Sequence, residues 1–290
     1  MGALTARMRV LVLGGTGFIG RTIVERLLAD GHSPTLFNRG RNASLFPEVE
    51  QLAGDRYAGD FGALAAGSWD AVVDVTSYVP RDVAGAMDAL GDRVGRYLLI
   101  SSHAVFDGAG PALRPPIRDA VWPLTNETYG PSKVACEQDV AGRFGARATI
   151  VRPVKVAGPY DDENGLVYWV RAAARGGRVS LPGDPAQPIQ LVDSRDLARL
   201  VVTLLATDRG GAFTAAGPTT TFAGLIGICA EAAGTSVEVV PVPPRGRFPL
   251  VRDPSVWPTL HRTPAPEMGA LTPLLTTARD VLAWDREATA

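Results

Sequence analysis

The sequence has few lysines, few cysteines and no long hydrophobic run, and each shortage excludes a class of protein. Of its 29 basic residues, only Lys133 and Lys155 are lysines. Cys136 and Cys229 stand far apart without metal-ligand spacing, so we expect free thiols in a reducing compartment and no metal site. The apolar runs are strand-sized and the N-terminus lacks the apolar core of a signal peptide. We therefore expect a cytoplasmic protein that contacts no membrane.

An excess of charge of either sign is also missing. The formal net charge is −1, which gives no electrostatic reason to expect nucleic acid as a partner. What the sequence does have is the composition of a globular protein, with 46% hydrophobic and 20% charged residues over 290 positions. This length can bury one large α/β domain, or one domain that carries a smaller lobe.

Short apolar runs alternate with helical patterns through the first half of the chain, which is typical of βαβ units. The predicted strands are 9–13, 33–37, 50–53, 71–75, 96–101 and 148–152, and the predicted helices are 17–30, 62–66, 81–90 and 129–143. We predict a doubly wound parallel Rossmann sheet over residues 8–160. Its ligand crevice should lie at the carboxyl ends of the strands.

The second half of the chain is less regular. We predict helices at 165–175, 193–206, 221–233 and 274–284, and strands at 179–181, 189–192 and 212–215. Residues 241–273 hold nine prolines together with Phe248 and Trp257, which favours a folded lobe or lid over a flexible linker. Residues 161–290 are therefore predicted to form mainly a smaller C-terminal substrate-binding lobe, with segments near 189–220 returning to the Rossmann domain.

Three glycines follow the first predicted strand with the spacing of a dinucleotide-binding loop. Gly14, Gly17 and Gly20 end a strand and open a helix, and this context gives the pattern its weight. The first permits a tight turn, the second lets backbone N–H groups approach a pyrophosphate, and the third lets helix pack on strand. The predicted cofactor contacts in this loop are Gly14, Thr16, Gly17, Phe18, Ile19 and Gly20.

The end of the second predicted strand distinguishes NADP from NAD. NAD-binding proteins usually place an acid there for the ribose hydroxyls, but this sequence reads Asn38-Arg39. Arg39 can form a charge-assisted bond to a 2′-phosphate while stacking on adenine. In so arginine-rich a chain, the alternative is a solvated surface arginine. The missing acid favours NADP(H) over NAD(H), and Asn38 and Arg39 are predicted contacts.

A tyrosine and a lysine lie one helical turn apart at the start of the predicted helix 129–143. Tyr129 and Lys133 should project from one helix face toward the crevice. An ammonium beside a phenol would lower the phenol pKa from about 10 toward working pH, so that Tyr129 could exchange a proton with a carbonyl oxygen. Ser102, after the fifth strand, would hold that oxygen. The alternative is an aromatic at a helix start, a solvated lysine and a strand-end hydroxyl.

The glycine loop 14–20, the stretch 99–106 and the motif 129–133 together resemble the extended short-chain dehydrogenase/reductases, which include the NAD-dependent epimerase/dehydratase family. The similarity runs from about residue 8 to residue 285. It implies further cofactor contacts at Asp55, Arg56, Thr76, Ser77, Lys133, Pro153 and Val154. The family usually has Ala or Gly at positions 76 and 77, so the roles of these two side chains stay open. A two-helix dimer interface is usual in the family, which leaves a monomer or a homodimer.

Two positions where nucleotide-sugar members of this family recognise a diphosphate differ in this chain. The expected Asn after the sixth strand is missing, and Ile189 stands about where an Arg would fall. A nucleotide sugar is therefore less favoured as substrate. The predicted substrate contacts are Ser102, His103, Lys155 and Trp169. Aromatic residues such as Trp122 and Trp257 suit a flat, apolar ligand, although they are equally common in cores.

These departures favour an NADPH-dependent ketoreductase that acts on a bulky aromatic ketone, similar in kind to the tailoring reductases of aromatic polyketide (angucyclinone-type) antibiotics. This interpretation rests on analogy. Two alternatives stay open. One is a nucleotide-sugar epimerase or dehydratase that retains its nicotinamide cofactor, and the other is a non-catalytic dinucleotide- or RNA-associated protein on the same fold.

Overall fold

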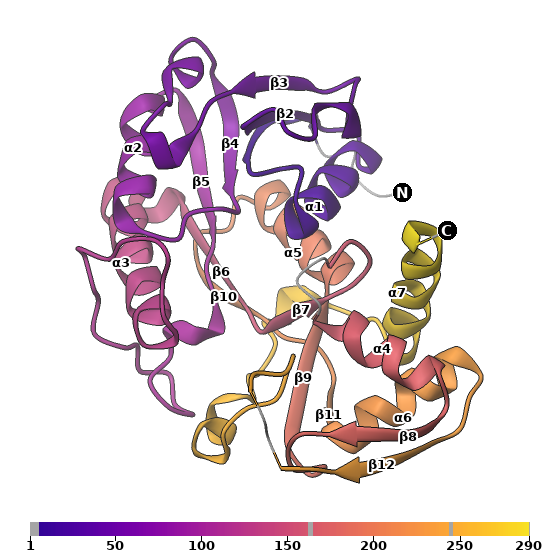
Figure 1. Cartoon of the computed structure of the whole chain (residues 1–290). Helices are drawn as coiled ribbons and strands as arrows, with labels where there is room; N and C mark the ends of the chain where they lie inside the picture. The colour runs from indigo at the N-terminus through magenta and orange to yellow at the C-terminus, as the bar shows by residue number, and fades with distance from the viewer. Residues whose placement is uncertain (1–5, 162–164, 244–245, 290) are drawn as a thin grey trace. The chain divides into compact units, whose positions relative to one another are not determined.

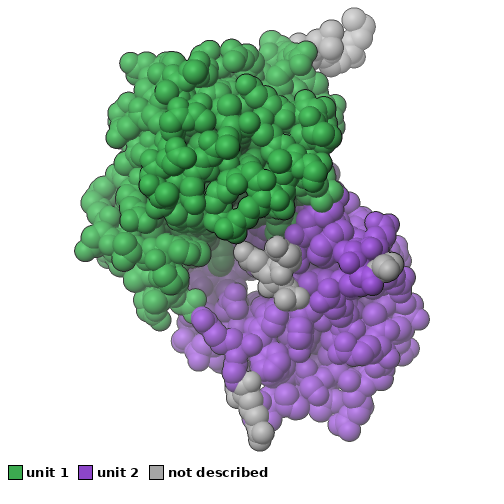
Figure 2. Space-filling view, turned by 45° about the horizontal axis from the view of Figure 1, so that its top comes forward, with its two compact units in different colours: residues 1–107, 111–153, 197–214 green, residues 108–110, 154–196, 215–290 purple. Residues whose placement is uncertain are grey.

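The structure is a computed structural model that describes residues 6–161, 165–243 and 246–289. The chain divides into two compact units, shown in different colours in Figure 2. Unit 1 comprises Met1–Asp107, Pro111–Pro153 and Leu197–Thr214, and unit 2 comprises Gly108–Gly110, Val154–Asp196 and Ala215–Ala290. The main division thus falls after Pro153, whereas the sequence suggested residue 160.

A seven-stranded sheet forms the centre of unit 1, in the order β10-β6-β5-β4-β1-β2-β3 (Figure 1). The strands are β1 (Arg9–Leu13), β2 (Ser33–Asn38), β3 (Glu50–Ala53), β4 (Trp69–Asp74), β5 (Val94–Ile100), β6 (Ala148–Pro153) and β10 (Gly211–Ala215). All neighbouring pairs from β3 to β6 are parallel, and Val12 lies opposite both Leu36 and Val73. The predicted doubly wound Rossmann sheet is confirmed. Its strand order reverses beside β1, where such sheets bind ligands.

Helices cover both faces of this sheet. Figure 1 shows α2 (Pro80–Leu90) and α3 (Asn126–Phe144) on one face, with α1 (Phe18–Ala29) and α5 (Ser194–Ala206) on the other. Alternate strand residues face α2 and α3, because side chains along a strand point to opposite sides. The resulting core includes Leu11, Leu13, Val72, Tyr97 and Leu99 from the strands, and Val83, Met87, Leu90, Cys136 and Val140 from the helices.

Helix α3 begins at Asn126, earlier than the predicted start at Tyr129. The reason is a capping box: the Thr125 hydroxyl accepts the Thr128 N–H, and the Thr128 hydroxyl accepts the Thr125 N–H. This reciprocal pair satisfies two N–H groups that a helix start otherwise leaves unpaired. Tyr129 therefore lies inside a capped helix and not at its frayed end.

The described residues of unit 2 form three α-helices and two small sheets. Its elements are α4 (Leu166–Ala174), α6 (Phe222–Ala233) and α7 (Leu274–Thr289), a sheet ordered β11-β9-β7 (Thr219–Thr221, Pro188–Asp193, Lys155–Ala157), and a pair β12-β8 (Val237–Pro241, Gly177–Leu181). Strands β7, β11 and β12 were not predicted, because they are short and lack a clear apolar alternation. The proline-rich segment contributes the buried side chains of Leu250 and Met268, as a folded lobe requires.

Two negative findings and one observation on the cysteines apply to the part of the chain that the structure describes. No helix there is long and apolar enough to cross a membrane. No group of three or more His, Cys, Asp or Glu side chains there could hold a metal ion. Cys136 and Cys229 are both buried free thiols, and burial raises the pKa of each to about 12.

Candidate active site

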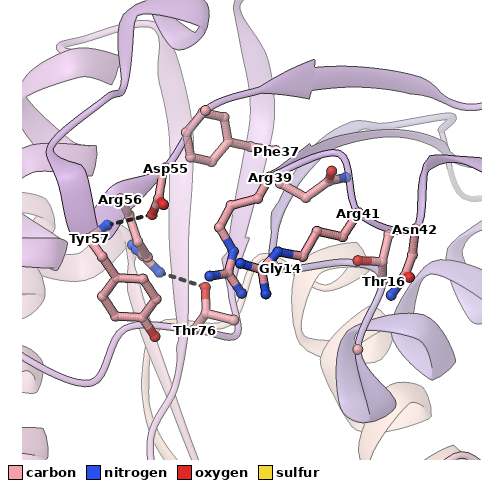
Figure 3. Close-up of a pocket in the computed structure, with 13 residues that line it drawn as sticks. Gly14, Thr16, Phe37, Arg39, Arg41, Asn42, Asp55, Arg56, Tyr57 and Thr76 are labelled. Carbon is pink, nitrogen blue, oxygen red and sulfur yellow. Dashed lines mark hydrogen bonds between the residues drawn. The ribbon is translucent and has the colours of Figure 1, made fainter. Parts of the chain in front are cut away.

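A cavity of about 260 Å³ lies at the carboxyl edge of the unit 1 sheet (Figure 3). It brings together eight of the predicted cofactor contacts, namely Gly14, Thr16, Gly17, Asn38, Arg39, Asp55, Arg56 and Thr76. Five further residues line it that the sequence reasoning did not assign to the cofactor: Phe37, Arg41, Asn42, Gly54 and Tyr57. Arg41 could have been found, since it is a second arginine two positions after Arg39. Tyr57 carried no comparable signal.

The glycine loop has the geometry that a dinucleotide requires. Gly14 adopts φ +93°, and a Cβ there would lie 2.3 Å from Cγ2 of Thr76, so only glycine fits. A Cβ on Gly20 would lie 2.0 Å from the Gly14 carbonyl oxygen, which explains the close packing of α1 on the loop. Gly17 caps α1, and a Cβ there would meet no atom within 4 Å. An anion can therefore approach the positive N-terminus of α1 closely.

Two arginines give the cavity an excess of positive charge after β2. Arg39 and Arg41 are both exposed, and Figure 3 shows both guanidinium groups turned toward the same part of the cavity, near Gly14. The Arg39 guanidinium carbon lies 5.9 Å from the centre of the Tyr57 ring. Asn38 shapes this loop, since its Oδ1 accepts the Gly40 N–H at 2.7 Å. Two neighbouring cations with open access favour binding of an anion.

Arg56 lies at the cavity wall, but its charge is already paired. Its guanidinium donates to both carboxylate oxygens of Asp74 at 2.8 and 3.0 Å and to Oγ1 of Thr76 at 2.8 Å. Although burial opposes ionisation of both groups, the ion pair holds the pKa of Asp74 below its ordinary value and that of Arg56 above it. The predicted cofactor contact at Arg56 would therefore use a side chain that Asp74 holds in place.

The family departure at positions 76 and 77 has a structural explanation. Ser77 is fully buried and does not line the cavity, and its hydroxyl donates to the Asp74 carboxylate. The Tyr97 hydroxyl donates to the same carboxylate at 2.5 Å, and the Thr76 N–H does so at 3.2 Å. A buried carboxylate needs such donors, because an unpaired charge in the interior is costly. The hydroxyls of Thr76 and Ser77 thus both bind the buried ion pair: that of Thr76 accepts from Arg56, and that of Ser77 donates to Asp74.

Lys133 is buried at the carboxyl ends of β4 and β5. Its side chain is 1% exposed, and its ammonium donates to the Ser77 carbonyl at 2.6 Å and to the Ile100 carbonyl at 2.7 Å. Burial lowers the pKa of Lys133. The solvated lysine that the sequence left open is excluded. Tyr129, half-buried, lies one turn earlier on the same helix.

Ser102 follows the end of β5. Its Oγ accepts the Ala104 N–H at 3.1 Å and so caps the short 3-10 helix His103–Val105. The side chain is 8% exposed, and the hydroxyl can still donate its own hydrogen. His103, the neighbouring predicted substrate contact, is half-buried in this 3-10 helix.

The remaining predicted residues do not line the cavity. Phe18, Ile19 and Gly20 lie in α1, and Pro153 ends β6 in unit 1, whereas Val154, Lys155 and Trp169 belong to unit 2. Trp169 is fully buried in the unit 2 core, and its indole N–H donates to the Pro249 carbonyl at 2.9 Å. It therefore takes the core position that the sequence allowed as an alternative to a substrate wall.

Comparison with known proteins identifies the family. The model of the NAD dependent epimerase/dehydratase family matches residues 10–79 and 66–216. The chain is 31% identical over 215 residues to 2'-dehydrokanamycin reductase of Streptomyces kanamyceticus, over 70% of this chain and 59% of that protein. It is 28% identical over 255 residues to the chloroplast stem-loop binding protein of 41 kDa b of Arabidopsis thaliana, over 79% of this chain and 64% of that protein.

A further relative is 2-alkyl-3-oxoalkanoate reductase of Stenotrophomonas maltophilia, 28% identical over 226 residues, covering 67% of this chain and 64% of that protein. The chain thus spans about three fifths of the length of these curated relatives.

Solved structures share the fold. UDP-N-acetylglucosamine 4-epimerase from Bacillus cereus has a TM-score of 0.71 at 19% identity, covering 96% of this chain and 99% of that one. RMD from Pseudomonas aeruginosa, complexed with NADPH, has a TM-score of 0.68 at 20% identity, covering 97% and 99%. With the glycine loop at the predicted edge of the sheet, this chain belongs to the NAD-dependent epimerase/dehydratase family of the extended short-chain dehydrogenase/reductases.

Proposed function

We propose that this protein is an NADPH-dependent ketoreductase that reduces a carbonyl group of a bulky aromatic secondary metabolite to an alcohol. The observation that carries the proposal is the buried ammonium of Lys133, fixed by two carbonyls and one helical turn from Tyr129. Lys133 is one of only two lysines among 29 basic residues, and burying an ammonium is costly, so we assign this side chain a role in the reaction.

The proposed roles follow from the chemistry of each side chain. Tyr129 donates its phenolic proton to the carbonyl oxygen, and Lys133 stabilises the phenolate that remains. The Ser102 hydroxyl donates a hydrogen bond to the same oxygen and so orients the carbonyl group. When bound, the reduced nicotinamide supplies the hydride to the carbonyl carbon. The product is an alcohol, and the phenol regains its proton from solvent.

We propose NADPH rather than NADH because of the two exposed arginines. Arg39 and Arg41 line the cavity after β2, where a NAD-specific site would place an acid. Guanidinium groups match phosphate oxygens in geometry and charge, so a 2′-phosphate is the anion that suits this position. Gly17 at the start of α1 would receive the pyrophosphate.

Two relatives support reduction of a carbonyl group, and one exposed aromatic side chain supports an aromatic substrate. Two of the curated relatives are named as reductases, one of 2'-dehydrokanamycin and one of 2-alkyl-3-oxoalkanoates. Within unit 1, Trp122 is 49% exposed and lies 4.9 Å, between ring centres, from Tyr78, whose ring lies 5.8 Å from the Lys133 ammonium. A flat apolar substrate can stack on such a surface.

An epimerase or dehydratase that retains its cofactor is the second candidate. The family match and fold neighbours such as the Bacillus cereus epimerase favour it to the same extent. The third candidate is a non-catalytic dinucleotide- or RNA-associated protein, and one relative is named a chloroplast stem-loop binding protein. The net charge of −1 favours neither nucleic acid nor a membrane surface for this chain, and we propose a cytoplasmic monomer or homodimer.

Cofactor stoichiometry distinguishes these functions. The purified protein is incubated with NADPH and three carbonyl substrates: a polycyclic aromatic ketone, an oxidised amino sugar and an aliphatic 3-oxo acid. One alcohol formed per NADPH oxidised, fastest with the aromatic ketone, is the expected result. Conversion of a nucleotide sugar without net NADPH loss would instead establish the epimerase or dehydratase function. No conversion of any substrate, together with unchanged biological activity of Tyr129→Phe, would favour the non-catalytic class.

A further inference from the structure

Two buried ion pairs flank the lysine of the proposed reaction. The first, Arg56–Asp74, has been described above. The second joins Arg152, at the end of β6, to Glu137 of α3, with Nε–Oε1 and Nη2–Oε2 distances of 3.0 and 2.6 Å. Glu137 is 4% exposed, and the Arg152 guanidinium carbon also lies 5.2 Å from the centre of the Phe106 ring.

Each ion pair reaches Lys133 through a serine. On the β4 side, the Ser77 hydroxyl donates to Asp74, and the carbonyl of the same residue accepts from the Lys133 ammonium. On the β5 side, the Ser101 hydroxyl donates to Oε1 of Glu137 at 2.5 Å, and the preceding carbonyl, that of Ile100, accepts from the ammonium. The two acceptors that hold Lys133 are thus each anchored by a side chain bonded to a buried carboxylate.

A lysine ammonium needs such acceptors to stay in one place. Its four-carbon stem is flexible and its three donors rotate freely, so the ammonium has no preferred direction of its own. Two of its donors are used by the carbonyls, and one remains to point toward a ligand. Lys133 and Glu137 lie one turn apart on α3, so the second ion pair also fixes the helix that carries Tyr129.

We propose that Asp74 and Glu137 are positioning residues that fix the Lys133 ammonium, through Ser77 and Ser101, in the orientation that proton transfer requires. This inference rests on the proposed function. It assigns a role beyond stability to two carboxylates that would otherwise count as structural. The expected cost of losing the position is large, because a displacement of about 1 Å can reduce turnover by about 10²-fold.

Unit 1 contains a matched control. Arg96 and Asp208 form a third ion pair, with Arg96 Nε 2.9 Å from Oδ1 of Asp208, and Arg96 also donates to the buried Thr149 hydroxyl at 3.0 Å. The Thr149 hydroxyl is thus also bonded to an ion pair, although it accepts from the arginine and donates to the Arg209 carbonyl, and no hydrogen bond of the described residues joins it to Lys133. Thr149→Ala therefore removes a comparable hydroxyl without touching the lysine.

The first test measures the hydrogen exchange rate of the Lys133 ammonium and needs no substrate. Because the chain has only two lysines, protein labelled with ¹⁵N-lysine gives at most two ammonium signals in NMR spectra, and Lys155→Arg identifies the one from Lys133. We expect slow hydrogen exchange of the Lys133 ammonium in the parent protein. The double variant Ser77→Ala/Ser101→Ala, which retains both ion pairs, should exchange about tenfold faster or more.

Thr149→Ala should leave that exchange rate unchanged. An unchanged rate in the double serine variant, or an equal rise in Thr149→Ala, would overturn the proposal. Asp74→Asn and Glu137→Gln should show larger effects than the serine variants where they fold, and circular dichroism checks folding. Because this measurement needs neither cofactor nor ketone, its result is independent of whether the ketoreductase function is correct.

The second test uses turnover by the NADPH-loaded enzyme. In the double serine variant, kcat should fall by about 10²-fold with little change in KM, and the acidic and basic limbs of the kcat pH profile should shift. If the two serines only stabilised the fold, the double variant would keep the parent kcat and pH profile at temperatures below its unfolding temperature. Altered ammonium exchange without carbonyl reduction in the parent protein would support the positioning role while rejecting the proposed reaction.

Discussion

The carboxyl edge of the unit 1 sheet carries exposed positive charge beyond β2 and buried positive charge beyond β4 and β5. At the cavity beyond β2, Arg39 and Arg41 are exposed and face an open space. At the ends of β4 and β5, Lys133 is buried, and the carboxylates of Asp74 and Glu137 are engaged by arginine and hydroxyl donors. The open end can bind an anionic ligand, and the buried end holds the Lys133 ammonium in a fixed position.

We therefore expect the open end to determine the affinity for the cofactor and the buried end to determine the position of the Lys133 ammonium. Water and salt screen the exposed guanidinium groups, so their contribution to the binding free energy depends on the charge of the ligand and on ionic strength. Buried ion pairs contribute little net stability compared with apolar packing, but breaking one leaves an uncompensated charge. Substitutions at the open end should therefore change which cofactor binds. Substitutions at the buried end should change turnover and folding.

The largest effect is expected for Tyr129→Phe. It removes the proton that the proposed reaction delivers, so kcat for ketone reduction should fall by roughly 10²- to 10⁴-fold. NADPH affinity, measured by fluorescence titration, should change little, because Tyr129 does not line the cavity at the open end. Full activity of this variant would exclude Tyr129 as the proton donor.

The next effect concerns folding. Asp74→Asn leaves the buried Arg56 guanidinium without its counter-charge and should lower the free energy of unfolding by about 3–5 kcal/mol. Arg39→Ala at the open end should change it by no more than about 0.5 kcal/mol. Urea denaturation of both variants measures the contrast. Equal losses would mean that the two ends do not differ as described.

A smaller change is expected in cofactor choice. Arg39→Ala should weaken NADPH binding by roughly 10- to 100-fold, since hydrogen bonds to charged groups contribute about 1.5–3 kcal/mol. NADH binding should stay nearly constant, because NADH has no 2′-phosphate. Arg9→Ala, an exposed arginine on the amino end of β1, is the control. Parallel losses for both cofactors would argue against a 2′-phosphate site.

The smallest effect appears only in acid. Since the pKa of Asp74 is lowered in the folded protein, its contribution to stability is fully present above the ordinary aspartate value of about 3.9 and is lost as pH falls through the lower, folded-state value. Asp82 titrates with the opposite sign, because burial raises its pKa. Unfolding free energies of Asp74→Asn and the parent should therefore converge below about pH 3.9. Parallel curves would contradict this assignment.

The sequence was sufficient to predict the parts of unit 1 that local patterns specify. Short runs between helical patterns placed β1 and β3 with the bounds that the structure has, and the glycine spacing placed the predicted cofactor loop. The start of α3 was missed because a Thr–Thr capping box is weaker as a sequence signal than Ser or Thr followed by Glu. In unit 2, three-residue strands such as β7 and β11 depend on pairing with β9 rather than on their own pattern.

The pairing of arginine with carboxylate at the buried end of the site could not be predicted, for a physical reason. Asp74 and Arg56 are 18 positions apart, and nothing in either local sequence shows that the two meet inside the protein. Glu137 was within reach of prediction, since it repeats the Tyr129–Lys133 spacing one turn on. Partners across a fold are set by the packing of strands and helices, which local sequence patterns do not encode.

The burial of Lys133 has a practical consequence for chemical modification. Amine-reactive reagents have only two lysine side chains to attack, and the folded protein shields one of them. Brief acylation of the folded protein should therefore leave Lys133 unlabelled. Label on Lys133 would then appear only in molecules whose α3 region had opened, so a peptide map becomes a record of local unfolding.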